Sequence, residues 1–146
     1  MFTEELLTAV EVLLQAKHPH GIAGRLNEVY ILTTDGWICH PYIAKSDRES
    51  QRNVDQVRQT LAELNERQAI GGVVQVALGW VVEGKPSEEI ADPESYPNKK
   101  EVLMLNGRGP AGTRVRVYEL RQEGRYRKLR RLIGAFDSLD MHIGGV

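Results

Sequence analysis

Val73-Val-Gln-Val-Ala-Leu-Gly-Trp-Val-Val82 is a nearly continuous apolar run, interrupted by Gln75. A strand that faces water on one side alternates between apolar and polar residues, and this run does not. Apolar residues on both sides are typical of a central strand that is covered on both faces of its sheet. We therefore predict that residues 73–82 form the central strand of the fold.

A helix is predicted directly before this strand. Ser46-Asp-Arg-Glu49 matches a capping box, in which the side chains of Ser46 and Glu49 bind each other's free backbone amides. An apolar stripe with helical spacing follows, and we expect the helix to end near Arg67, before Gly71-Gly72. The stripe consists of Val54, Val57, Leu61 and Leu64.

The N-terminal part predicts a helix followed by a β-hairpin. We expect Thr3 to cap the helix and Pro19 to end it. Residues 28–34 and 37–43 are rich in β-branched and aromatic residues, and Asp35-Gly36 between them favours a tight hairpin turn. The helix presents apolar residues at helical spacing, namely Leu6, Leu7, Val10, Leu13 and Leu14.

After the central strand, the pattern predicts a long polar loop and a second group of strands. The loop covers residues 83–98, with strands at 100–105 and 113–121 and a glycine-rich turn at 106–112. Residues 125–136 fit two states, because Leu129, Leu132, Ile133 and Phe136 have helical spacing while the flanking glycines suit a short sixth strand. We expect the tail from about residue 137 to be loose.

Together these elements predict a single α+β domain over residues 1–146, in the order α-β-β-α-β-β-β. The sheet is expected to be mostly antiparallel, with five or six strands and both helices packed on one face. A chain of 146 residues can bury a sufficient core without disulfides or metals.

Composition favours an intracellular location. Cys39 is the only cysteine, so no internal disulfide is possible, and the first residues lack the basic and apolar regions of a signal peptide. No apolar run is long enough to span a bilayer. We expect a cytoplasmic or virion-associated protein that does not act at a membrane.

Charge is distributed unevenly although the net charge is only −1. Residues 83–96 hold five acidic residues against one base, a net charge of −4, and residues 113–131 hold eight bases against two acids, a net charge of +6. The basic segment is the strongest functional signal in the sequence. Its candidate partner- or nucleic-acid-binding residues are Arg114, Arg116, Tyr118, Arg121, Arg125, Arg127, Lys128, Arg130 and Arg131.

Three interpretations fit such a segment. It could attract an acidic protein surface and accelerate docking. It could bind nucleic-acid phosphates while Tyr118 and Tyr126 stack on bases. It could also be a solvated face whose charge the acidic residues 83–96 offset within the molecule. Near-neutrality of the whole chain favours a protein partner over nucleic acid, because dedicated nucleic-acid-binding domains are usually basic throughout.

Motifs for catalysis and metal binding are incomplete. Glu83-Gly-Lys85 after an apolar strand is similar to the E-x-K of restriction-endonuclease-like nucleases, but such a site also needs an acid on an adjoining strand. His18, His20 and Cys39-His40 are possible zinc ligands, yet neighbours on a strand point to opposite faces. No Gly-x-Ser-x-Gly nucleophile motif occurs. We predict no metal and no cofactor.

The layout between residues 73 and 120 resembles that of a loose group of small uncharacterised bacterial and phage α+β proteins. The resemblance consists of an apolar strand with Gly79-Trp80, a variable polar loop, the strand Tyr96-Pro-Asn-Lys-Lys-Glu-Val-Leu103 and a closing strand at 112–120. It implies the same kind of fold and carries no activity with it.

These observations predict a non-catalytic interaction module, an accessory protein of a phage or mobile element that binds a larger protein through its basic C-terminal surface. A nucleic-acid-binding protein that uses the strand face 114–131 is the alternative, and a metal-dependent nuclease around Glu83 and Lys85 is the third hypothesis. The sequence leaves the oligomeric state open.

Overall fold

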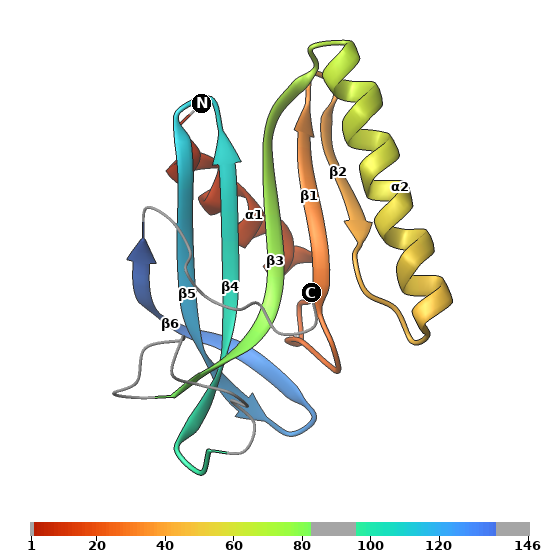
Figure 1. Cartoon of the computed structure of the whole chain (residues 1–146). Coiled ribbons are helices and arrows are strands. Elements are labelled where there is room, and N and C mark those ends of the chain that lie inside the picture. The colour runs from red at the N-terminus through yellow and green to blue at the C-terminus, as the bar shows by residue number, and fades with distance from the viewer. Residues whose placement is uncertain (1, 83–95, 137–146) are drawn as a thin grey trace.

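The computed structural model describes residues 2–82 and 96–136, and in these ranges two helices accompany one six-stranded sheet (Figure 1). All strand pairs are antiparallel, in the spatial order β2-β1-β3-β4-β5-β6. The predicted α+β class and element order are confirmed, and β3 has an interior position, as its apolar sequence predicts. The elements are α1 (Thr3–Lys17), β1 (Asn27–Thr33), β2 (Gly36–Pro41), α2 (Asp47–Glu66), β3 (Ile70–Val82), β4 (Lys99–Gly109), β5 (Gly112–Glu123) and β6 (Tyr126–Phe136).

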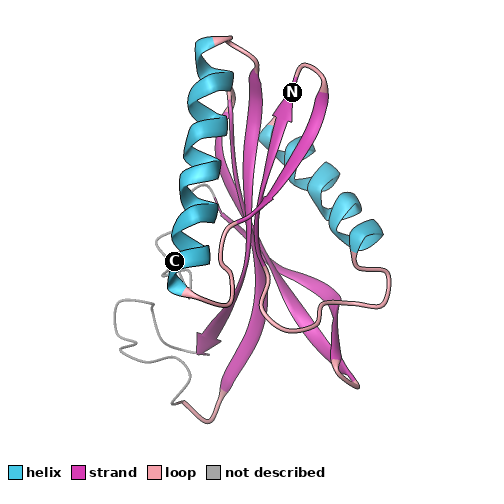
Figure 2. Cartoon of the chain, turned by 90° about the vertical axis from the view of Figure 1, so that its right-hand side faces the viewer, coloured by secondary structure: helices cyan, strands magenta, loops and turns pink. Residues whose placement is uncertain are grey.

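Each helix covers its own face of the sheet, whereas we expected both helices on the same face. Val74 and Val76 of β3 belong to the core cluster of α1, but Val73 packs with Val57 of α2. Successive residues of a strand point to opposite faces, so the two helices lie on opposite sides. Figure 2 shows the strands between the two helices. The reason is β3 itself, which is apolar on both sides and therefore needs a cover on each.

Helix α1 packs closely because glycines lie beneath it. A Cβ atom on Gly107 would be 2.7 Å from Cδ2 of Leu7, and one on Gly109 would be 2.8 Å from Cδ1 of Leu6. Gly72 of β3 also lies directly against the Leu6 side chain. Leu6 and Leu7 are fully buried in this contact. The glycines thus let two leucines approach the sheet backbone, which larger residues would prevent.

Two expectations drawn from the sequence, one about a turn and one about a helix cap, are wrong. The segment 106–112 is not a turn throughout, because β4 continues to Gly109 and only Pro110-Ala111 separates it from β5. Thr3 does not cap α1 but forms its first residue, and its hydroxyl donates a hydrogen bond of 2.8 Å to the carbonyl oxygen of Gly112. Both features fix the start of α1 on the β4–β5 hairpin.

Helix α2 is predominantly polar and packs through one narrow stripe. Ser46 is its N-cap, as predicted, and Oγ of Ser46 accepts a hydrogen bond of 3.2 Å from the amide of Glu49, which is one of the two bonds of a capping box. Val57 is buried against Val29 and Ile31 of β1. Neither α1 nor α2 has the length and apolar character that a helix needs to cross a membrane, and this statement covers the described residues alone.

The segment that fitted two states is strand β6, and two register shifts explain its helical spacing. Leu129 pairs with Leu120 and Arg131 with Glu119, so Arg130 is an extra residue; a second shift leaves Ile133 extra. Each such β-bulge adds one residue to the two-residue period of a strand. Leu129 and Leu132 therefore lie on the same face although they are three residues apart.

The contact beneath α1 makes Gly107→Ala a sensitive test. We expect this substitution to lower the free energy of unfolding by about 1–3 kcal/mol, because the new methyl group overlaps the tightly packed Leu7. Gly71→Ala is the matched control, since its Cβ atom would be 3.3 Å from the nearest atoms, which belong to the half-buried Leu32. Urea unfolding of both variants measures the difference. Equal stability of the two variants would contradict the close approach.

Candidate functional site

Two of the predicted binding residues on β5, Arg116 and Tyr118, face α1 instead of solvent. Nη2 of Arg116 donates a hydrogen bond of 2.6 Å to Oε2 of Glu4, and a bond of 3.0 Å to Oγ1 of Thr8. The hydroxyl of Tyr118 donates a bond of 2.7 Å to Oε2 of Glu11. Both residues therefore hold α1 in place and are not available as a face for a partner.

The environment of Tyr118 excludes a role in stacking on bases. Its side chain is buried, and burial together with the hydrogen bond to Glu11 raises its pKa to about 12. A stacking platform needs an accessible ring face. The predicted face of Arg114, Arg116 and Tyr118 is thus a buried polar contact along most of its length. Only Arg114 remains exposed there, with Nε 3.9 Å from Oε1 of Glu4.

Arg127 on β6 also binds other parts of the fold instead of facing solvent. Its Nη1 lies 2.7 Å from Oε1 of Glu101 on β4, and its guanidinium donates to the carbonyl oxygens of Ile22 and Gly24. The backbones of Ile22 and Arg127 exchange hydrogen bonds of 2.8 and 3.0 Å. Gly21 has φ +105°, and a Cβ atom at this position would lie 2.9 Å from the carbonyl oxygen of Arg127. Arg127 therefore fixes the connection between α1 and β1 onto the outer edge of β6.

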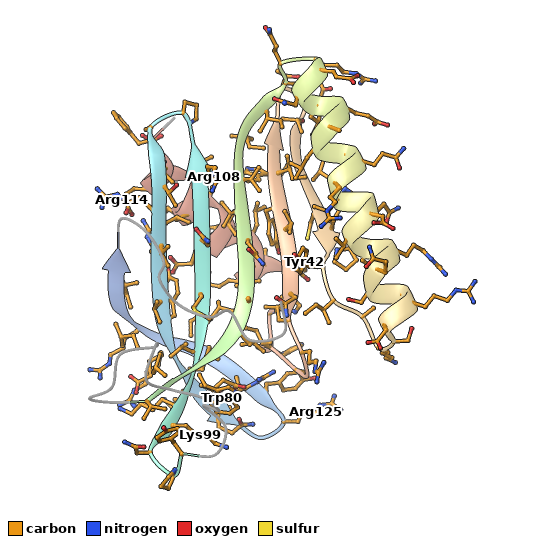
Figure 3. All side chains as sticks on the ribbon, in the orientation of Figure 1. Tyr42, Trp80, Lys99, Arg108, Arg114 and Arg125 are labelled. Atoms are coloured by element: carbon orange, nitrogen blue, oxygen red, sulfur yellow. The ribbon has the colours of Figure 1, made fainter. Side chains whose placement is uncertain are left out.

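Hollows flank the Arg127 side chain on both sides. One, of about 260 Å³, is lined by residues that include His18, Ile22 and Leu129. The other, of about 240 Å³, is lined by residues that include Trp80 and Glu101. The Trp80 ring also lies 4.9 Å from Nζ of Lys99 (Figure 3). Both hollows are small for a ligand pocket.

The remaining predicted cations gather on the β5–β6 hairpin. Four of them have side chains that are at least half exposed, and Arg125 at the turn is exposed as well (Figure 3). Strand pairing places Arg121 beside Lys128 on the face opposite α1. We call this group the β5–β6 cationic cluster: Arg121, Arg125, Lys128, Arg130 and Arg131.

Two carboxylates partly balance the cluster. Glu119 lies 2.7 Å from Nε of Arg131 and 3.7 Å from Nη1 of Arg130. Glu123 lies 3.1 Å from Nζ of Lys128. The guanidinium of Arg125 lies 5.0 Å from the centre of the Tyr126 ring and donates to its hydroxyl.

Five cations against two carboxylates leave an excess of three positive charges on an exposed hairpin. The long side chains keep their freedom, because exposed ion pairs hold them only weakly.

A second polar cluster joins α1 to the first hairpin, and the sequence analysis did not find it. Oε1 of Glu28 lies 2.8 Å from Nζ of Lys17, and Oε2 accepts a bond of 2.7 Å from the Tyr30 hydroxyl. Sγ of Cys39 lies 3.4 Å from the same lysine nitrogen. The only signal in the sequence is the two-residue spacing of Glu28 and Tyr30, which places both on one strand face.

Burial controls the chemistry of this second cluster. Burial raises the pKa of the Cys39 thiol, and the charge of Glu28 raises it further, so the thiol stays protonated and is a poor nucleophile. Burial also opposes ionisation of Glu28, but hydrogen bonds from Lys17 and Tyr30 outweigh it and lower the pKa of Glu28. The cluster therefore has the properties of a buried structural network.

Metal ligands do not converge in the part of the chain that the structure describes. Within those residues no three His, Cys, Asp or Glu side chains form a group that could hold a metal ion. Cys39 and His40 point to opposite faces, and Nε2 of His40 lies 3.2 Å from Oγ1 of Thr60 on α2. Glu83 and Lys85, the residues of the nuclease hypothesis, lie outside the described residues.

Comparison of the chain with protein-family models, with curated proteins and with solved structures gave no match.

Glu28 makes the stability of the protein sensitive to acid. Because its pKa is lower in the folded than in the unfolded protein, ionised Glu28 stabilises the fold above its unfolded pKa, and this contribution is lost as the pH falls through the folded pKa. We expect Glu28→Gln to be less stable than wild type at neutral pH and to lose less stability on acidification. Urea unfolding across the acidic range measures both slopes. If the free energy of unfolding fell equally for both proteins as the pH is lowered, the result would contradict an ionised Glu28 in the folded protein.

Proposed function

We propose that this protein is a non-catalytic interaction module that docks onto an acidic surface of a larger protein through the β5–β6 cationic cluster. The observation that carries the proposal is the excess of positive charge on one exposed hairpin, while Arg116 and Arg127 of the same basic segment hold the fold together. Such a surface accelerates encounter with an acidic partner and excludes basic ones.

The geometry of the cluster supports a protein partner over nucleic acid. Arg116 and Tyr118 are engaged with α1, so no ring on β5 is open for stacking. Glu119 and Glu123 lie among the cations and would repel phosphates. A protein surface with a basic group of its own can pair with the partly exposed Glu123, whereas a uniformly charged phosphate chain cannot.

Docking is expected on the face of the hairpin and not along the edge of β6. An added strand needs a regular row of free backbone groups. The pairing of Ile22 with Arg127 occupies the edge near the start of β6, and bulges at Arg130 and Ile133 interrupt it further on. Bulges and charges of this kind protect edge strands against further pairing. The side chains are therefore the elements that recognise the partner.

Replacing cluster cations by glutamine tests the proposal. The test variant carries four Arg/Lys→Gln changes at exposed cluster positions: Arg121, Arg125, Lys128 and Arg130. The control carries the same change in charge at exposed positions of α2 and its C-cap: Arg48, Arg52, Arg58 and Arg67.

We expect wild type and control to retain the same protein from a nuclease-treated lysate, and the test variant to lose it. The association rate with that protein should be at least about 10-fold lower for the test variant than for wild type. Added salt should lower the rate of wild type more steeply than the rate of the test variant. Equal retention by both variants would contradict the proposal. Loss of all retention after nuclease treatment would favour the nucleic-acid alternative.

A further inference from the structure

The face of the sheet opposite α1 carries an apolar patch on β4 and β5. Val102 and Met104 of β4 and Val115 and Val117 of β5 form a buried cluster, and none of the four is more than 3% exposed. Tyr118, the neighbour of Val117, belongs to the core under α1, so the cluster points to the other side of the sheet. We call these four residues the β4–β5 apolar patch.

Neither helix contributes an apolar side chain to this patch, as far as the described residues extend. Helix α1 lies on the opposite face, and the apolar stripe of α2 packs against β1, β2 and Val73 of β3. Figure 1 shows β4 and β5 beside α2 and not beneath it. Apolar side chains on an uncovered face of a sheet stay in contact with water. The nearly complete burial of the patch therefore calls for a cover that neither helix provides.

Residues 137–146 follow β6, lie outside the described residues and have the composition of such a cover. Leu139, Met141 and Ile143 alternate with Asp140 and His142. In an extended chain this alternation gives one apolar and one polar side.

The composition of residues 83–95, which also lie outside the described ranges, is different. This segment holds one large apolar residue, Ile90, among five acidic residues. It has no apolar side to place on the patch, so the sequence favours residues 137–146.

The end of β6 brings residue 137 next to the patch. Phe136, the last residue of β6, pairs with Val115, which is a member of the patch. Adjacent strands are about 4.8 Å apart, so β4 lies about 10 Å from β6. About three extended residues span this distance. The segment is also attached covalently, which gives it a higher effective concentration at the patch than a free partner has.

We propose that residues 137–146 lie across the β4–β5 apolar patch of the same chain, with Leu139, Met141 and Ile143 against it. The sequence led us to expect a loose tail from about residue 137, and that expectation falls on residues outside the described ranges. The inference goes beyond the proposed function and does not depend on it, because the β5–β6 cationic cluster takes no part in this contact.

Oxidation of methionine by hydrogen peroxide tests both sides of the contact in the wild-type protein. Met104 belongs to the patch and Met141 to the segment, and sulfoxide forms faster when the sulfur is exposed. We expect both residues to be oxidised at least about 10-fold more slowly in the native protein than in urea, as measured by mass spectrometry of their peptides. Equal rates for Met141 in the native and the unfolded protein would contradict the contact.

Two double variants separate the apolar from the polar side of the segment. Leu139→Ser with Ile143→Ser removes apolar side chains and keeps Met141 as a reporter. The control, Asp140→Ser with His142→Ser, makes the same number of changes at the polar positions between them. We expect the first variant to raise both oxidation rates at least about 10-fold and the control to leave them unchanged.

Alkylation of Cys39 distinguishes loss of the cover from unfolding of the whole protein. Cys39 packs against the core cluster of α1, on the other face of the sheet. Its alkylation rate should be the same in wild type and both variants, because loss of the segment uncovers only the patch. If this rate rises together with the oxidation rates, the variant has unfolded, and the oxidation of Met141 in the wild-type protein decides the question.

Three further results would overturn the inference. Equal oxidation rates in the two double variants would show that the apolar residues of the segment do not protect the patch. Met104 that stays protected while Met141 reacts freely would assign the cover to another part of the chain, or to a second copy if the protection depends on protein concentration. Met104 that reacts in wild type as fast as in urea would show an open patch, available to a different partner.

Discussion

The packing of α1 onto the glycine-bearing face of the sheet is the contact on which the rest of the structure depends. Leu6 and Leu7 reach the backbone of two strands, β3 and β4, because Gly72, Gly107 and Gly109 leave room for them. The start of the helix is fixed to the β4–β5 hairpin through Thr3, and its last turn is fixed to β1 through Lys17 and Glu28. Apolar contact supplies the main driving force for this packing, and the polar bonds determine the orientation of α1.

The same contact divides the basic C-terminal segment into two parts. Arg116 and Tyr118 satisfy Glu4 and Glu11 of α1, and Arg127 fixes the connection that leaves the helix. Apart from Arg114, which lies near Glu4, the cations of the segment that remain exposed lie near the turn of the β5–β6 hairpin. A charge count along the sequence treats these two groups alike, but their surroundings give them different roles. The surface that remains for recognition, the β5–β6 cationic cluster, is smaller and more localised than the basic segment as a whole.

The sequence predicts the element order and the interior position of β3 because both depend on local pattern. The cap at Ser46 and the hairpin of β1 and β2 show this, although the two turn residues are Thr34-Asp35 and Gly36 already pairs with Thr33. We expected both helices on one face, whereas α1 and α2 cover opposite faces of β3, which is apolar on both sides. The helical spacing in β6 was misleading because two bulges changed the period of a strand. Glu4, which binds Arg116, and Ile22, which binds Arg127, are more than a hundred residues away from these arginines, and local patterns carry no information about such contacts.

A double-mutant cycle between Glu11→Gln and Tyr118→Phe tests most directly whether residues of the predicted binding face hold α1 to the sheet. Tyr118→Phe removes the donor of a hydrogen bond of 2.7 Å, and Glu11→Gln removes the charge of its acceptor, which also lies 3.7 Å from Nη1 of Arg116. Urea unfolding of the wild type, the two single variants and the double variant gives the coupling energy. The account predicts a stabilising coupling of about 0.5–3 kcal/mol. Additive effects, with no coupling, would show that Tyr118 does not bind Glu11 of α1. Tyr118 would then again be a candidate binding residue.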